Sequence, residues 1–191
     1  IVTVSDWIDE VPALLSAWYA GQAGGEAVAD VLLGEVNPSG RLPDTVPVRM
    51  DDSSWYGRIS GPENRIEYAE GVFVGYRYYD SRNLPVQYPF GYGLSYTSFE
   101  YGPLRLSKTD LAGPDDTLTA EVDIANTGSR PGKETAQLYV GDLEASLERP
   151  IHELKGFKKV EIAPGATETV RFEIDRSMLC FFDPEAKAWR A

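Results

Sequence analysis

The sequence offers little sulfur or imidazole chemistry. One cysteine, Cys180, and one histidine, His152, occur in its 191 residues. A lone cysteine excludes a disulfide within the chain, and the apolar neighbours in residues 178–182 favour a small buried core residue over a reactive thiol. No metal-ligand spacing surrounds His152 or the paired aspartates at 51–52 and 115–116. We therefore expect no metal ion and no cofactor.

Basic residues are also scarce. The chain carries 18 Lys and Arg against 30 Asp and Glu, a net charge of −12. With no basic patch to offset the acidic residues, this balance argues against nucleic acid as a partner. No apolar run reaches the length of a membrane span, so no membrane partner is expected either. No signal peptide is visible at the β-branched residues 1–4, and we expect a processed or trimmed start.

Aromatic residues and glycines, in contrast, are concentrated in residues 68–101, which hold most of the eleven tyrosines. Alternate positions over residues 72–77 have the period of two that predicts a strand. Turn-forming residues follow at 80–85, and then Pro-Phe-Gly-Tyr-Gly at 89–93. This loop is too apolar to be left in solvent. We therefore predict that it is a structural seam, against which the flanking parts of the chain pack.

The first residues of the chain favour a helix. It is predicted to begin near Trp7, with Ser5 or Asp6 as its N-cap. Apolar residues at 14–18 would form one stripe along its surface. The glycines at 21–25 then end this pattern.

A second helix and an extended stretch are predicted before the aromatic segment. The helix covers residues 26–33 and stops at Gly34. Residues 41–48 contain two prolines, which exclude a helix interior and predict extended chain. Residues 49–67 are polar and rich in turn formers, so an irregular surface loop is expected there.

From residue 99 onward the pattern changes to short strands separated by turns. Strands are predicted over 118–125, 135–140, 158–162 and 167–174. Several short strands at this spacing indicate an antiparallel β-sandwich of the immunoglobulin or fibronectin type III kind. The sequence therefore predicts an α+β chain, with the remnant of an α/β sandwich layer and its seam loop over 1–98 and a β-sandwich over 99–191.

Three long stretches resemble one family in the order in which that family has them. Residues 17–47 are similar to the last helix and exit loop of the α/β domain of glycoside hydrolase family 3, the family of β-glucosidases and β-xylosidases. Residues 68–101, with YAEGVFVGYRYYD and YPFGYGLSYTSFEY, resemble the segment that follows, and residues 149–174 resemble its fibronectin type III-like domain. The resemblance implies that a last strand of the sandwich is missing after Ala191.

The resemblance does not supply catalytic residues. Retaining glycosidases need two carboxyl groups, a nucleophile and an acid/base, about 5–5.5 Å apart. In the family, the nucleophilic aspartate lies on an N-terminal barrel domain and the acid/base glutamate lies upstream of the matching part. Ser5-Asp6-Trp7 resembles the tripeptide around the nucleophile, but residues 8–15 run directly into the helix match. A helix cap is therefore favoured for Asp6, with a nucleophile as the alternative, and no catalytic residue is assigned.

Candidates for binding a sugar lie in two places. Trp55 and Tyr56, in the polar loop, are the candidate substrate-binding residues, because aromatic faces stack on sugar rings. Glu70 and Arg77 either line the sugar site or form a partly buried ion pair that braces the seam, and the ion pair is favoured.

The predicted function is that of the C-terminal portion of a retaining glycoside hydrolase, a β-glucosidase acting on terminal non-reducing β-D-glucosyl residues. Its expected partners are a β-glucoside or oligosaccharide and the remaining catalytic domains of the same enzyme, and an oligomer is left open. The alternative is a stand-alone carbohydrate-binding or adhesion β-sandwich without catalysis. The α/β remnant before residue 98 is the feature that distinguishes the two, because a free module would not carry it.

Overall fold

The computed structural model describes residues 3–58 and 68–191. It divides into two compact units. The first unit contains Ile1–Val36, Gly40–Leu94 and Gly141–Glu153, and the second contains Asn37–Ser39, Ser95–Val140 and Leu154–Ala191. The domain boundary near residue 98 stays a prediction.

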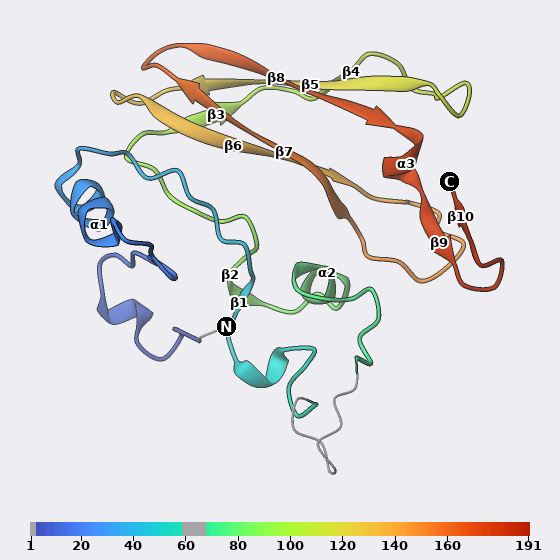
Figure 1. Cartoon of the computed structure of the whole chain (residues 1–191), viewed down its shortest axis with the longest axis horizontal. Helices are drawn as coiled ribbons and strands as arrows, with labels where there is room; N and C mark the ends of the chain where they lie inside the picture. The colour runs from blue at the N-terminus through green and yellow to red at the C-terminus, as the bar shows by residue number, and fades with distance from the viewer. Residues whose placement is uncertain (1–2, 59–67) are drawn as a thin grey trace. The chain divides into compact units, whose positions relative to one another are not determined.

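The second unit is built from antiparallel strands. Its principal strands are β3 (Phe99–Tyr101), β4 (Arg105–Leu106), β5 (Thr117–Asn126), β6 (Gly132–Val140), β7 (Glu153–Ile162) and β8 (Thr167–Asp175). Strand β5 pairs with β3, β4 and β8, and β6 pairs with β7. Figure 1 shows β4, β5 and β8 in one layer and β6 and β7 in the layer beneath it.

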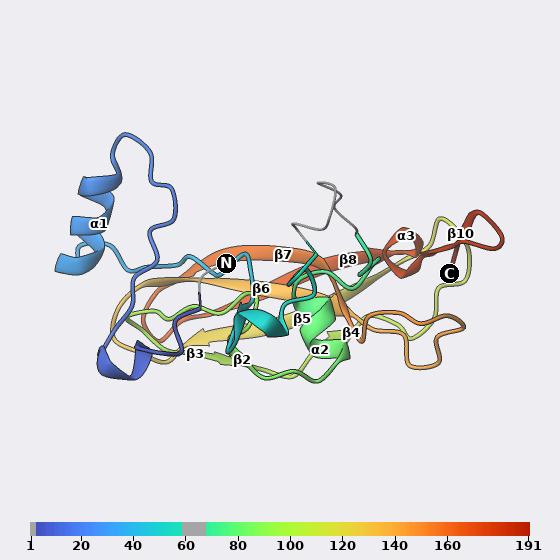
Figure 2. The ribbon, with the colours of Figure 1, turned by 90° about the horizontal axis from the view of Figure 1, so that it is seen from below.

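A hairpin follows the sandwich strands. After β8 come the single helical turn α3 (Arg176–Leu179) and the hairpin of β9 (Phe181–Asp183) and β10 (Ala188–Arg190). Both views place these three elements at one end of the unit, beside the C-terminus (Figures 1 and 2). Cys180 lies between α3 and β9 and is partly buried.

The core of the second unit lies between the two layers. Ile124 of β5, Ile162 of β7 and Val170 of β8 are fully buried and pack together with Ala136 of β6. Burying one such side chain stabilises a fold by about 1.5–3 kcal/mol. The alternating sequence of these strands produces this arrangement, since every second side chain of a strand faces the same side. All four predicted strands of the sandwich are confirmed, each longer than expected.

The first unit contains short elements joined by long connections. They are the 3-10 turns η1 (Ile8–Glu10) and η2 (Met50–Asp52), the helices α1 (Gly24–Leu33) and α2 (Tyr76–Ser81), and the paired strands β1 (Val46–Pro47) and β2 (Val86–Tyr88). Helix α1 ends at Gly34, whose φ of 80° is the left-handed conformation of a C-cap. The helix predicted over 26–33 and its stop are confirmed. The mixture of these elements with the antiparallel sheets confirms the α+β class.

The predicted first helix does not form. Only η1 is present, no side chain caps it, and residues 11–20 have no regular secondary structure. Ser5, a predicted cap, instead donates its hydroxyl to the Val48 carbonyl at 2.8 Å. An amphipathic helix depends on packing of its apolar face, and residues 11–20 are all exposed in the described part of the chain.

The strand predicted over residues 72–77 is also wrong. Gly75 adopts a φ of 55° and helix α2 begins at Tyr76. Val72 and Val74, which suggested the strand period, are both exposed. The helix is instead fixed by Tyr79, which is buried and donates its hydroxyl to Ser53 at 3.1 Å.

Helix length also bears on the membrane prediction. Across residues 3–58 and 68–191, no helix is both long and apolar enough to span a bilayer.

Candidate functional site

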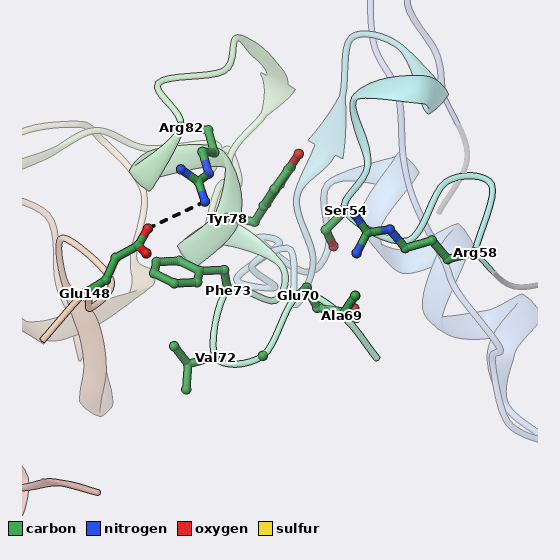
Figure 3. A pocket seen from close by; sticks show the side chains of 10 residues that line it. Ser54, Arg58, Ala69, Glu70, Val72, Phe73, Tyr78, Arg82 and Glu148 are labelled. Atoms are coloured by element: carbon green, nitrogen blue, oxygen red, sulfur yellow. Dashed lines mark ion pairs between the residues drawn. The ribbon is translucent and has the colours of Figure 1, made fainter. Parts of the chain in front are cut away.

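A pocket of about 420 Å³ lies in the first unit. Three stretches of chain line it: the loop after η2, the turn that precedes α2 together with α2 itself, and the connection between β6 and β7. The lining residues are Ser54, Arg58, Ala69, Glu70, Gly71, Val72, Phe73, Tyr78, Arg82 and Glu148 (Figure 3). A volume of this size lies in the range of small-molecule sites.

An ion pair and an aromatic ring form one side of the pocket. Arg82, the residue that directly follows α2, forms an ion pair with Glu148 at 3.5 Å. The same guanidinium lies over the ring of Phe73, 5.7 Å from its centroid. Both charged side chains are more than half exposed, so the pair contributes little to stability. The pair nevertheless places a hydrogen-bond donor, Arg82, and an acceptor, Glu148, beside the Phe73 ring at the pocket.

Glu70 stands out among the lining residues. Its Oε2 atom is buried, and among the described residues no hydrogen-bond partner reaches that oxygen. A buried carboxylate oxygen without a donor is costly. Sequence reasoning named Glu70 with Arg77, either as lining of a sugar site or, preferably, as an ion pair. The favoured ion pair is wrong, because the structure pairs Arg77 with Glu153, at 3.3 Å.

The connection between β6 and β7, residues 141–152, belongs to the first unit together with Glu153, the first residue of β7, and it is tied to α2. Besides the pair of Arg77 with Glu153, His152 Nε2 lies 3.1 Å from Asp80 and its ring stacks on Tyr76. These contacts link one turn of helix to a segment about 70 positions later in the sequence. They are absent from any local pattern, and sequence reasoning missed them.

The first and last few residues of this connection also contact each other. Arg149 pairs with Asp142 at 2.9 Å and with Glu153 at 3.5 Å. A Cβ atom on Gly141 would lie 2.4 Å from the carbonyl oxygen of Ile151, so only glycine fits there. The two ends of the connection therefore approach each other closely, and Glu148 lies between them in the sequence.

The predicted sugar-binding residues, Trp55 and Tyr56, do not line the pocket, although residues close to them in the sequence do. Tyr56 is about half exposed, at 54%, and Trp55 is partly buried. Their neighbours Ser54 and Arg58 do line the pocket. The rest of the predicted loop, residues 59–67, lies outside the described residues.

Two acidic or weakly acidic groups near this loop have perturbed pKa values. A hydrogen bond from Arg49 lowers the pKa of the Asp51 carboxyl. Burial raises the pKa of the Tyr79 hydroxyl, against the opposing effect of its hydrogen bond to Ser53. Tyr79 thus stays neutral and acts as a structural donor.

Asp6, the alternative nucleophile, is exposed and lies two positions before η1 begins at Ile8. The helix that it was expected to cap is absent. In the described part of the chain, no group of three or more His, Cys, Asp or Glu side chains is arranged to hold a metal ion.

Comparison with known proteins identifies the class of the chain. Residues 1–96 match the Glycosyl hydrolase family 3 C-terminal domain, and residues 134–191 match the Fibronectin type III-like domain. The chain therefore matches the C-terminal portion of the proteins of this family. It belongs to glycoside hydrolase family 3.

Individual relatives cover nearly the whole chain. Thermostable beta-glucosidase B of Acetivibrio thermocellus is 45% identical over 183 residues, which are 96% of this chain and 24% of that protein. An exo-alpha-(1->6)-L-arabinopyranosidase of Bifidobacterium breve is 39% identical over 189 residues, 99% of this chain and 24% of that protein. The crystal structure of the Bifidobacterium adolescentis GH3 beta-glucosidase superposes with a TM-score of 0.91 at 39% identity, covering 99% of this chain and 27% of that one. The chain spans about a quarter of the length of the curated relatives that it matches.

Proposed function

We propose that the chain is the C-terminal portion of a retaining β-glucosidase that hydrolyses terminal non-reducing β-D-glucosyl residues. The observation that carries this proposal is the similarity, over 96% of the chain, to a protein named as a beta-glucosidase. The catalytic carboxylates are supplied by the remaining domains of the same enzyme. The role of these 191 residues is to complete the α/β part and to carry the sandwich.

The stand-alone module alternative is disfavoured by the first half of the chain. Residues 1–96 match a glycosidase domain, which a free carbohydrate-binding sandwich would not carry. A second candidate activity has support from the arabinopyranosidase relative, at 39% identity. The sugar specificity is thus the part of the proposal that most needs measurement.

The test compares the full-length protein with the 191-residue chain on three chromogenic substrates. The full-length protein should hydrolyse a p-nitrophenyl β-D-glucoside with a higher kcat/KM than the corresponding α-L-arabinopyranoside or β-D-xyloside. The 191-residue chain should hydrolyse none of them. Turnover by the short chain that Asp6→Asn abolishes would instead make Asp6 the nucleophile.

Within the proposed enzyme, Trp55 and Tyr56 would bind the second sugar of a disaccharide. Aromatic side chains supply flat apolar faces, and the neighbouring Asp52 and Arg58 offer polar contacts for hydroxyl groups. The exposure of Tyr56 supports a role in binding. The alternative for this loop is a solvated connector.

A further inference from the structure

We propose that the pocket around Glu70 is a saccharide-binding site, separate from Trp55 and Tyr56, to which the connection between β6 and β7 contributes Glu148. The inference rests on the proposed glycosidase function for the presence of a sugar ligand. It adds a binding site that does not use either aromatic residue of the preceding loop, because neither of them lines the pocket.

The first argument is the unsatisfied oxygen of Glu70. A buried carboxylate oxygen needs a hydrogen-bond donor, and no described residue provides one to Oε2. A ligand with hydroxyl groups would supply it upon binding. The carboxylate would then accept a short hydrogen bond of the charge-assisted kind.

The second argument is the balance of charge around the pocket. Arg58 and Arg82 carry two positive charges, and Glu70 and Glu148 carry two negative charges. An anionic or cationic ligand would meet like charges on part of this wall. A neutral ligand that both donates and accepts hydrogen bonds meets none, and a saccharide is such a ligand.

The third argument is the apolar surface between the charged groups. Val72 and Phe73 line the pocket, and Phe73 lies under the Arg82 guanidinium (Figure 3). The C–H face of a sugar ring packs against side chains of this kind while its hydroxyl edge reaches polar groups. The lining therefore offers an apolar surface together with hydroxyl partners.

The position of Glu148 gives the site an additional feature. Glu148 lies on the connection between β6 and β7. Three residues of helix α2, Tyr76, Arg77 and Asp80, contact the end of this connection. Arg82, the partner of Glu148, directly follows the same helix. The strands β6 and β7 thus carry between them a segment that takes part in ligand binding.

The experiment is isothermal titration of the full-length protein with glucose and with cellobiose, the latter in a non-hydrolysable thio-linked form. The wild-type protein should show two classes of site, the catalytic site and the pocket. Glu70→Gln keeps the size of the side chain and removes its charge, and it should weaken the second class by at least roughly tenfold, as expected for a lost hydrogen bond to a charged group. Val72→Trp, at an exposed position, should fill the pocket and abolish that class.

The matched control is Glu168→Gln, the same change at an exposed position of β8 in the second unit. It should retain both classes of site and the wild-type rate of hydrolysis. A single class of site in the wild-type protein, or two classes of unchanged affinity in both Glu70→Gln and Val72→Trp, would overturn the proposal. A failure of the proposed function would be seen separately, as absence of β-glucoside hydrolysis by the wild-type protein.

Discussion

Arg77 is one of the three residues of helix α2, with Tyr76 and Asp80, that contact the segment between β6 and β7. Its guanidinium lies 3.3 Å from Glu153 and 6.0 Å from the centroid of the Tyr76 ring, and only 30% of its side chain is exposed. Removing it leaves Glu153, which is 18% exposed, with one cationic partner fewer. Arg77→Ala should therefore lower the free energy of unfolding by about 1–3 kcal/mol.

Urea denaturation of the full-length protein, followed by tryptophan fluorescence, measures this loss. Arg49→Ala is the matched control, since Arg49 pairs with Asp51 at the surface, where solvent screens the pair and it contributes little to stability. Equal effects of the two substitutions would show that the pair of Arg77 with Glu153 does not brace the unit.

Trp55 carries the prediction about the polar loop. If its ring stacks on the second sugar of a substrate, Trp55→Ala should raise KM for cellobiose by about tenfold, the loss of about 1.4 kcal/mol of binding energy, and change KM for an aryl β-glucoside much less. Steady-state kinetics of the full-length protein on both substrates tests this. Trp189→Ala, at an exposed tryptophan of β10, is the control and should alter neither constant. Equal kinetics of Trp55→Ala on the two substrates would leave the loop as a connector.

Among the elements, strand β5 has a charge arrangement that predicts a pH dependence. Hydrogen bonds from Arg105 and Thr169 lower the pKa of Asp123 to about 2, from the ordinary aspartate value of 3.8. Because the folded-state pKa is lowered, the stabilisation is complete above pH 3.8 and is lost as the pH falls towards about 2. Asp123→Asn should thus melt below wild type at neutral pH, and the difference in Tm should shrink between pH 4 and pH 2, roughly the interval between the two pKa values.

Melting curves at a series of pH values, recorded by circular dichroism, measure this difference. Asp110→Asn is the control, since its carboxyl lies on the connection between β4 and β5 and contacts only Thr109 among the hydrogen bonds of the described residues. A difference for Asp123→Asn that stays constant down to pH 2 would show that the carboxylate does not stabilise the folded state.

The elements also show why sequence reasoning succeeded in the second unit and failed in part of the first. Strand β5 was predictable because its apolar residues alternate, and its fully buried residues, Ala120, Ile124 and Asn126, all face the same side of the strand. Helix α2 was not, because the alternation that precedes it belongs to exposed valines at a glycine turn. The partners of α2 lie 26 positions earlier, at Ser53, and about 70 positions later, on the connection between β6 and β7. No pattern in a short window records such contacts. The pocket was hidden for the same reason, because its lining comes from stretches far apart in the sequence; the sequence named Glu70 as a candidate but not its surroundings.

For the whole molecule, exposed apolar residues near the start of the chain predict its behaviour in isolation. Leu14, Leu15, Trp18 and Tyr19 are all more than 40% exposed, and Leu33 of α1 is 78% exposed. An exposed apolar surface of this kind favours association. The 191-residue chain, expressed alone, should self-associate and bind a hydrophobic dye, whereas the full-length protein should do neither.

Sedimentation velocity and dye fluorescence measure the two properties. A variant of the short chain with Leu14→Ser, Leu15→Ser and Trp18→Ser should show weaker association than the unchanged short chain. A monomeric short chain that unfolds cooperatively and binds no dye would contradict the prediction and would favour an autonomous module.

The backbone passes between the two units at 36–37, 39–40, 94–95, 140–141 and 153–154. A recombination event with a single crossover therefore cannot exchange one unit for its counterpart from a related enzyme without leaving a foreign segment behind. A chimaera joined at residue 94 would bring the recipient a connection that evolved against another α2, with different partners for Arg77 and Asp80. Inheritance of the two units is thereby linked, and engineering by domain exchange must transfer residues 141–153 together with α2.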